Sequence, residues 1–271
     1  MERRFTASDG TTIYYGDSGE RDGVPIAFCH GIAVSSVQFT DDAEYFAGLG
    51  YRVLTPDLRG HGKSSRPPVH KRGYRLERLA LDQAEMLDDA GIGQIHWIGN
   101  SLGGITGLAM LKYHAQRLSS LTTFGTAYAL QMPRADVDKF FAFNFKLFKP
   151  LVVKTAAYLC SKDDGTRRRI EEMAMASDTK AVSAVASSLL GYDFMDEALA
   201  SRLPTLLMRL GNDNLMNWAL GRTLKLAEGR PNLEMIELVN GGHCANLDDN
   251  AHWRAALLKF LQPFRPALPV R

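Results

Sequence analysis

Short runs of apolar residues alternate along the chain with longer segments in which apolar residues recur at helical spacing. Several of the short runs are apolar at nearly every position, which is typical of parallel strands covered by helices on both faces. The sequence predicts eight strands of this kind, at 3–8, 11–17, 24–30, 51–57, 94–100, 118–126, 204–212 and 232–240.

The longer segments have the patterns of amphipathic or buried helices. Between 75 and 91 the apolar residues fall on one stripe, and Gly91 is a typical stop signal. The segments 102–117 and 251–262 are also predicted to be helical. Repeated strand–helix units of this length predict an α/β fold with an eight-stranded, mostly parallel, doubly wound sheet.

One stretch, from about 129 to 200, interrupts this alternation. It contains only helical or irregular patterns, and five of the 13 phenylalanines lie within 140–148. We expect 129–200 to be a helical cap inserted over the carboxyl edge of the sheet, where open α/β folds bind their ligands. The core would then comprise residues 1–128 and 201–271. A small independent domain is the alternative, which its length and lack of staples disfavour.

Composition and charge exclude several classes of protein. The chain has 271 residues, of which 45% are hydrophobic and 23% charged, and its formal net charge is +2. No basic block predicts nucleic-acid binding, and no apolar run is long enough for stable membrane insertion. No secretory signal is visible at the start, and the three cysteines have no paired spacing. We therefore expect a cytoplasmic protein, and the sequence predicts no particular oligomeric state.

The segment WIGNSLGGITG, residues 97–107, places Ser101 between glycines two positions away on either side. It follows an apolar strand and precedes a helical segment. A serine on such a tight turn is pushed out of the sheet edge in a strained conformation, and side chains at 99 and 103 would crowd neighbouring backbone. The turn also points the helix N-terminus at the serine, so that the Leu102 N–H can stabilise an oxyanion.

On this motif and its context, the chain resembles the α/β-hydrolase superfamily. CHGI, residues 29–32, follows the third predicted strand and matches the His-Gly turn of that family. The resemblance implies that the Ile32 backbone N–H is the second oxyanion donor, and that His30 and Gly31 shape this turn beside the substrate. DLRGHGKS, residues 57–64, matches a family loop that is largely structural. The resemblance covers essentially the whole chain outside 129–200.

A serine nucleophile needs a base, and the base needs a carboxylate that holds its tautomer. His243 lies in a glycine-rich loop between the last strand and the last helix, which is the family position for the base. Asp213, at the end of PTLLMRLGND, is the family position for the acid, although Gly211 is two residues before it instead of three and Asn217 stands where the family often has a proline. Asp248 and Asp249 are its rivals, and they resemble charges in the first turn of a helix.

The three residues predict hydrolysis through an acyl-enzyme on Ser101, with no cofactor and no metal. The phenylalanines of the insertion, with Phe140 and Phe141 as candidate substrate contacts, favour a small, mainly apolar substrate. A carboxylic ester is the leading expectation. A lactone remains open, as does the carbon–carbon bond of a ring-cleavage product, because an asparagine precedes the serine. A ligand receptor and a cofactor-free oxygenase are the further alternatives.

Overall fold

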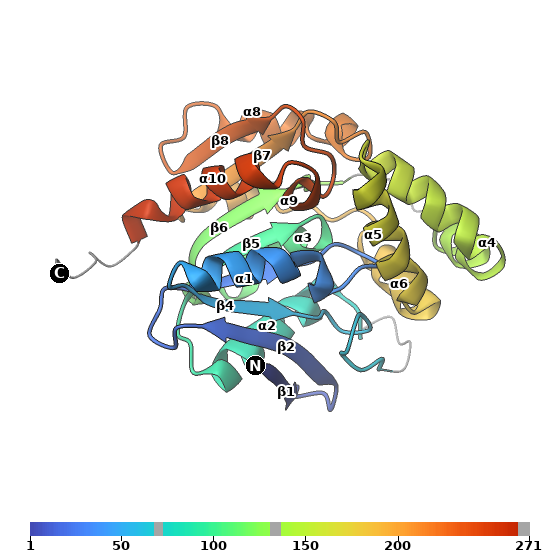
Figure 1. Ribbon diagram of the computed structural model, residues 1–271, viewed down its shortest axis with the longest axis horizontal. Helices are drawn as coiled ribbons and strands as arrows, with labels where there is room; N and C mark the ends of the chain where they lie inside the picture. Colours follow the sequence, from blue (N-terminus) through green and yellow to red (C-terminus); the bar gives the residue numbers. More distant parts are fainter. Residues whose placement is uncertain (68–72, 131–136, 265–271) are drawn as a thin grey trace.

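One sheet of eight strands forms the centre of the molecule (Figure 1). The structure is a computed structural model that describes residues 1–67, 73–130 and 137–264, with only the backbone described for 137–147. The strand order is β1-β2-β4-β3-β5-β6-β7-β8, in which β1 pairs antiparallel with β2, β2 pairs antiparallel with β4, and the other pairs are parallel. Each predicted strand is present: β1 Glu2–Thr6, β2 Thr12–Gly19, β3 Pro25–Cys29, β4 Arg52–Pro56, β5 Ile95–Asn100, β6 Leu118–Phe124, β7 Thr205–Leu210 and β8 Leu233–Leu238.

Helices cover both faces of the sheet, which confirms the doubly wound arrangement. On one face, α1 (Thr40–Gly48) and α10 (Asn250–Leu261) bury Phe46 and Trp253 against the strands. On the other face, α2 (Leu76–Ala90) and α3 (Leu102–Tyr113) pack together and bury Leu79 and Leu108. The shorter described elements are η1 Ser36–Phe39, η2 Ala115–Arg117, η3 Asn217–Ala219, α8 Gly221–Ala227, α9 Ala245–Asp248 and η4 Gln262–Phe264.

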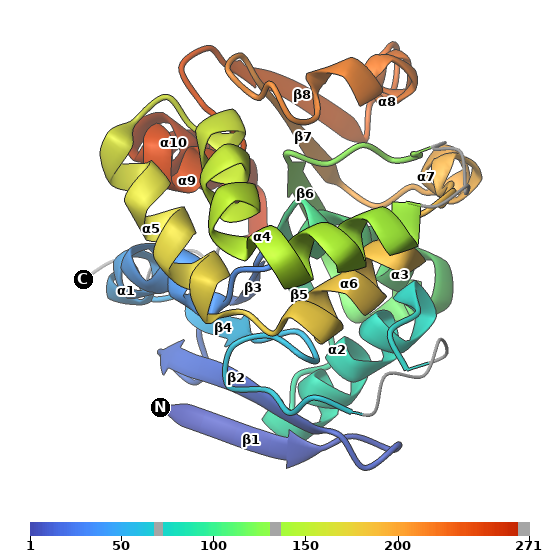
Figure 2. The ribbon, with the colours of Figure 1, turned by 90° about the vertical axis from the view of Figure 1, so that its right-hand side faces the viewer.

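Four helices occupy the segment between β6 and β7: α4 Val137–Cys160, α5 Asp164–Ala176, α6 Thr179–Ser188 and α7 Met195–Ala200. The helical path of α4 is interrupted at Phe148, shortly before Pro150. Figures 1 and 2 show α4, α5 and α6 beside the end of the sheet to which the parallel strands point, and we call these three the cap helices. The helix α7 lies in the same predicted insertion but contacts α3 and α8 of the core instead.

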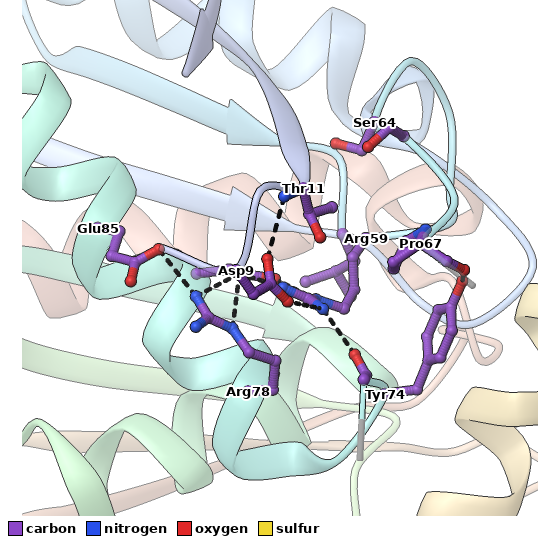
Figure 3. Close-up of polar contacts among 12 residues, drawn as sticks. Asp9, Thr11, Arg59, Ser64, Pro67, Tyr74, Arg78 and Glu85 are labelled. Carbon is purple, nitrogen blue, oxygen red and sulfur yellow. Dashed lines mark hydrogen bonds and ion pairs between the residues drawn. The ribbon is translucent and has the colours of Figure 1, made fainter. Parts of the chain in front are cut away.

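The loop that carries DLRGHGKS is tied to the core by a buried ion network (Figure 3). The side chain of Arg59 is fully buried, and it donates to Asp82 of α2 at 2.6 and 2.7 Å. Its third nitrogen donates to Asp9 Oδ2 at 2.8 Å, and Arg78 adds a second guanidinium on Asp82. Because buried charges need paired partners, this network holds the loop in one place, in keeping with a structural role.

Candidate active site

Ser101 stands on a strained turn between β5 and α3. Its φ of 51° and ψ of −114° lie in a region that non-glycine residues rarely adopt, at a cost of roughly 1–3 kcal/mol. A Cβ on Gly99 would lie 2.3 Å from the Gly103 backbone, and one on Gly103 would lie 2.0 Å from the Cys29 carbonyl oxygen. The side-chain-free positions that the sequence motif required are therefore explained by close backbone approach.

His243 and Asp213 form a buried pair at the ends of β8 and β7. The His243 Nδ1–H donates to Asp213 Oδ2 at 2.9 Å. Burial acts to raise the pKa of Asp213, but the facing His243 and the N–H groups of Leu215 and Met216 outweigh it and lower that pKa. An ionised Asp213 favours the proton on Nδ1 of His243, so Nε2 is the ring nitrogen that could accept a proton.

Asn100 joins the histidine loop to the turn that carries Ser101. Its Nδ2 donates to the His243 carbonyl oxygen at 2.8 Å and, more weakly, to Phe124 O at 3.3 Å. The histidine ring lies close to the end of β6, since a Cβ on Gly125 would come within 2.9 Å of His243 Nδ1. The structure thus places the loop of His243, whose ring is bonded to Asp213, against the residue that precedes Ser101.

The CHGI turn after β3 lies against the serine. A Cβ on Gly31 would be 3.6 Å from Ser101 Cβ, so the backbone at Gly31 borders the side chain of Ser101. Leu102 is the first residue of α3, where helical N–H groups have no partner within the helix. The N–H groups of Ile32 and Leu102 therefore come from the two backbone segments that flank Ser101, as two oxyanion donors must.

His30 is held by its own turn. Its Nδ1 pairs with Gly31 O at 2.7 Å, and its Nε2 accepts from Leu58 N at 3.0 Å. Burial lowers the pKa of His30 to about 4, so the ring is neutral. With both nitrogens bonded to backbone, His30 is suited to shaping the turn, and its place beside the substrate stays a prediction. The side chains of Phe140 and Phe141 lie outside the described residues.

The cap helices touch the site at two places. An aliphatic cluster joins Ala33 and Ile32, in the turn after β3 that we call the oxyanion turn (residues 30–33) after its predicted role, to Val153 of α4 and Val182 of α6. At the other end of α4, the Cys160 carbonyl accepts the His243 N–H at 2.7 Å. The cap helices are therefore fixed to both the oxyanion turn and the histidine loop.

Asp248, the alternative candidate for the acid, makes its contacts elsewhere and is not bonded to the His243 ring. Its carboxylate accepts from the Ser161 hydroxyl at 2.5 Å and from Gly242 N at 3.0 Å, and so binds the end of α4 to the histidine loop. His243 Nδ1 is bonded to Asp213 instead. Asp249 precedes α10 and pairs with His252 at 2.6 Å.

Sequence reasoning missed three buried polar residues behind this site, Gln38, Asp42 and Asn246, which are at most 1% exposed. Their positions have no motif, and burial of a polar side chain is the only signal that could have revealed them. Within the described residues, no cluster of histidine, cysteine or acidic side chains could hold a metal ion. Burial raises the pKa of the Cys29 and Cys244 thiols, which keeps both protonated.

The comparisons with known proteins agree with this fold. The family model for the alpha/beta hydrolase fold matches residues 24–250. The chain belongs to this family. A relative named "Putative carbamate hydrolase RutD", from Stutzerimonas stutzeri, is 30% identical over 224 residues, which is 78% of this chain and 82% of the relative. The relatives of this alpha/beta hydrolase support hydrolase activity at the level of the enzyme class.

Solved structures show the same fold at lower identity. A thermophilic esterase from Thermogutta terrifontis has a TM-score of 0.86 at 21% identity, covering 98% of this chain and 100% of the esterase. An enol-lactonase from Burkholderia xenovorans has a TM-score of 0.80 at 21% identity, covering 96% of this chain and 100% of the lactonase. Among the described residues of the present chain, no helix is long and apolar enough to cross a membrane.

Proposed function

We propose that the protein is a serine hydrolase that cleaves a carboxylic ester of a small, mainly apolar substrate through an acyl-enzyme on Ser101. The observation that carries this proposal is the His243–Asp213 hydrogen bond of 2.9 Å, on a loop that Asn100 ties to the strained serine turn. Strained backbone of this kind clusters at functional sites, and a serine near an imidazole that is paired with a carboxylate is the arrangement that nucleophilic catalysis uses.

The reaction follows from the role of each group. Nε2 of His243 takes the hydroxyl proton of Ser101 as Oγ attacks the carbonyl carbon, and the N–H groups of Ile32 and Leu102 hold the oxyanion. The intermediate collapses, the bond to the leaving alcohol breaks, and His243 returns the proton to the departing oxygen. Water, deprotonated by His243, then attacks the acyl carbon and releases the acid. Asp213 stabilises the imidazolium at each stage.

The substrate class is supported by the surroundings of the oxyanion turn. The cap helices present aliphatic side chains there, with Val152 and Val153 packed near Ile32 and Ala33. An apolar acyl group would gain roughly 0.8 kcal/mol for each methylene that it buries against such a surface. Phe140 and Phe141 remain candidate contacts on the same helix α4.

The alternatives differ in how well this site supports them. A lactone is an intramolecular ester and would use the same residues. The carbon–carbon hydrolase reading began from Asn100, but that amide is buried and bonded to His243 O and Gln38, so it is not available to a substrate. A carbamate, as in the name of the relative RutD, has a similar carbonyl. A cytoplasmic location is proposed with the enzyme, on its unpaired cysteines.

The decisive experiment is labelling with a fluorophosphonate followed by peptide mapping, because it reports an activated serine whatever the natural substrate. We expect covalent modification of Ser101 in the wild type and none in Ser101→Ala, with an unchanged far-UV circular dichroism spectrum. A series of p-nitrophenyl esters and lactones would then rank the substrates. Modification of another serine, or turnover by Ser101→Ala at the wild-type rate, would contradict the proposal. An unlabelled wild type that still binds ligand would favour the receptor, and oxygen uptake would favour the oxygenase.

A further inference from the structure

One buried amide contacts three of the segments that build the site. Gln38 lies in η1 and is 1% exposed. Its Oε1 accepts the N–H of Gly31 in the oxyanion turn at 3.2 Å. Its Nε2 donates to Asn100 Oδ1 beside the nucleophile at 2.9 Å, and to Asn246 Oδ1 in α9 at 3.1 Å. The oxyanion turn, the end of β5 and the helix after the histidine loop thus meet at one side chain.

The orientation of this amide is fixed by its partners. A backbone N–H such as that of Gly31 can only donate, so the oxygen of Gln38 must face it. The two hydrogens of its Nε2 then meet two acceptor oxygens, and the full bonding capacity of the NH₂ group is used. If the amide were rotated by half a turn, donor would face donor at Gly31 and acceptor would face acceptor at both asparagines.

The same logic fixes the neighbouring amides. Asn246 Nδ2 donates to the backbone carbonyl oxygen of Gln38 at 3.1 Å and to Asp42 Oδ2 at 2.9 Å. The other oxygen of Asp42 accepts from Arg254 Nε at 2.8 Å. At the opposite end of the network, Asn100 Nδ2 donates to the backbone carbonyl oxygen of His243 at 2.8 Å. A continuous chain of hydrogen bonds therefore runs from Arg254, on α10, to the predicted base.

An apolar side chain at position 38 could fill the same volume without the cost of burying a polar group. Apolar contacts, however, are not directional, whereas a fully satisfied buried network favours one arrangement of the segments that it joins. Oxyanion donors and a general base need placement to within about an ångström, because such an error can cost about 100-fold in rate. The network therefore lies where a directional link has the greatest effect on the chemistry.

We propose that Gln38 is a positioning residue, which holds the oxyanion turn, the nucleophile turn and the histidine loop in mutual register. The proposal rests on the function proposed above. Gln38 is buried and bonded on all sides, so it acts through Gly31, Asn100 and Asn246 and not on the substrate.

The test compares Gln38→Met with a matched control, Gln83→Met. Gln83 is also fully buried, in α2, but its amide has no hydrogen-bond partner among the described residues. For a p-nitrophenyl ester, we expect kcat of Gln38→Met to fall by about 10- to 100-fold with KM within about threefold of wild type. The control should keep the wild-type kcat. A Gln38→Met enzyme with wild-type kcat, or an equal loss in the control, would overturn the proposal.

Two further variants separate positioning from general loss of structure. Gln38→Glu keeps the acceptor for Gly31, but its carboxyl can donate to an asparagine oxygen only when protonated. The kcat of Gln38→Glu should therefore gain a pH dependence that the wild type lacks. This variant still tests the proposal if Gln38→Met fails to fold. Adding Asn246→Leu to Gln38→Met should cost little more than either change alone, because both break one network. Fully additive losses, or an unchanged pH profile, would speak against the proposal.

One readout does not depend on turnover. The proton between His243 and Asp213 can be observed by proton NMR at low field, and its resonance should broaden or vanish in Gln38→Met while persisting in Gln83→Met. If the wild type is not labelled at Ser101, the proposed function fails, and this resonance still decides the role of Gln38. An identical resonance in both variants would refute the positioning role.

Discussion

Replacing Gly103 by alanine should damage both stability and turnover, because the new methyl group would meet backbone. A Cβ at this position would lie 2.0 Å from the Cys29 oxygen and 2.9 Å from the His30 oxygen. Helix α3 and the end of β3 would have to separate by about 1 Å to relieve the contact, and overpacking of this kind costs roughly 1–3 kcal/mol. Alanine returns at most about 1 kcal/mol of helix propensity, so the net change is destabilising.

The same displacement should lower kcat, since the two backbones that must separate carry the proposed oxyanion donors. A misplacement of about 1 Å can reduce the rate by about 100-fold. The measurements are urea unfolding and ester hydrolysis at a temperature well below the unfolding midpoint, where the variant is fully folded. A Gly103→Ala enzyme with wild-type kcat would show that the close approach of α3 to β3 does not place the donors.

Two other helical glycines provide controls. A Cβ on Gly48, in α1, would meet nothing within 4 Å, so Gly48→Ala should be neutral or slightly stabilising. On Gly107, in α3, it would lie 2.6 Å from Trp97 and 2.7 Å from Leu121, both at side-chain atoms in the core. Gly107→Ala should therefore lose stability but keep kcat. Equal loss of kcat in Gly107→Ala and Gly103→Ala would refute the argument, because it would reduce both effects to general instability.

Three further changes test other parts of the structure. Asp213→Asn should lower kcat by about 10⁴-fold, as in other triads, since the imidazole loses its tautomer; a loss below tenfold would contradict this. Asp82→Asn should cost about 3 kcal/mol in urea unfolding, because the fully buried guanidinium of Arg59 loses one of its two carboxylate partners. Asp88→Asn, at an exposed pair, should cost under about 1 kcal/mol. Burial lowers the pKa of His96 to about 4, so protons bind this histidine more readily in the unfolded chain. As pH falls from 6.5 towards 4, the free energy of unfolding of the wild type should fall by about 1.4 kcal/mol per pH unit relative to that of His96→Gln. Parallel plots of unfolding free energy against pH would refute this.

The fold was accessible from the sequence because its signals are local. All eight strands appear where short strand-like runs predicted them, and α2, α3 and α10 follow the predicted helical segments closely. The helices α1 and α8 were not predicted. The apolar residues of α1 that reach the core are few, with Phe46 its main buried hydrophobic side chain, and α8 is only seven residues long.

The site was accessible in part, for the same reason. Gly99 and Gly103 are needed by a turn that lies within a few residues of sequence, so the pattern can be read from one segment. The link from Gln38 to Asn246 spans 208 residues and depends on which side chains the fold buries together. No periodicity or spacing encodes such a contact, and only the assembled sheet and helices reveal it.

The two strained residues of the described chain clarify how the site is stabilised. Ala33 and Ser101 are the non-glycine residues with positive φ among those described, at 62° and 51°, and both border the proposed oxyanion site. Strain of about 1–3 kcal/mol persists at such positions only where surrounding contacts outweigh it. For Ser101 these contacts are backbone approaches too close for any side chain, and for Ala33 they are the aliphatic side chains of the cap helices. The cap helices would thus help to form the oxyanion turn as well as cover it, which couples the identity of the apolar wall to the rate of the reaction.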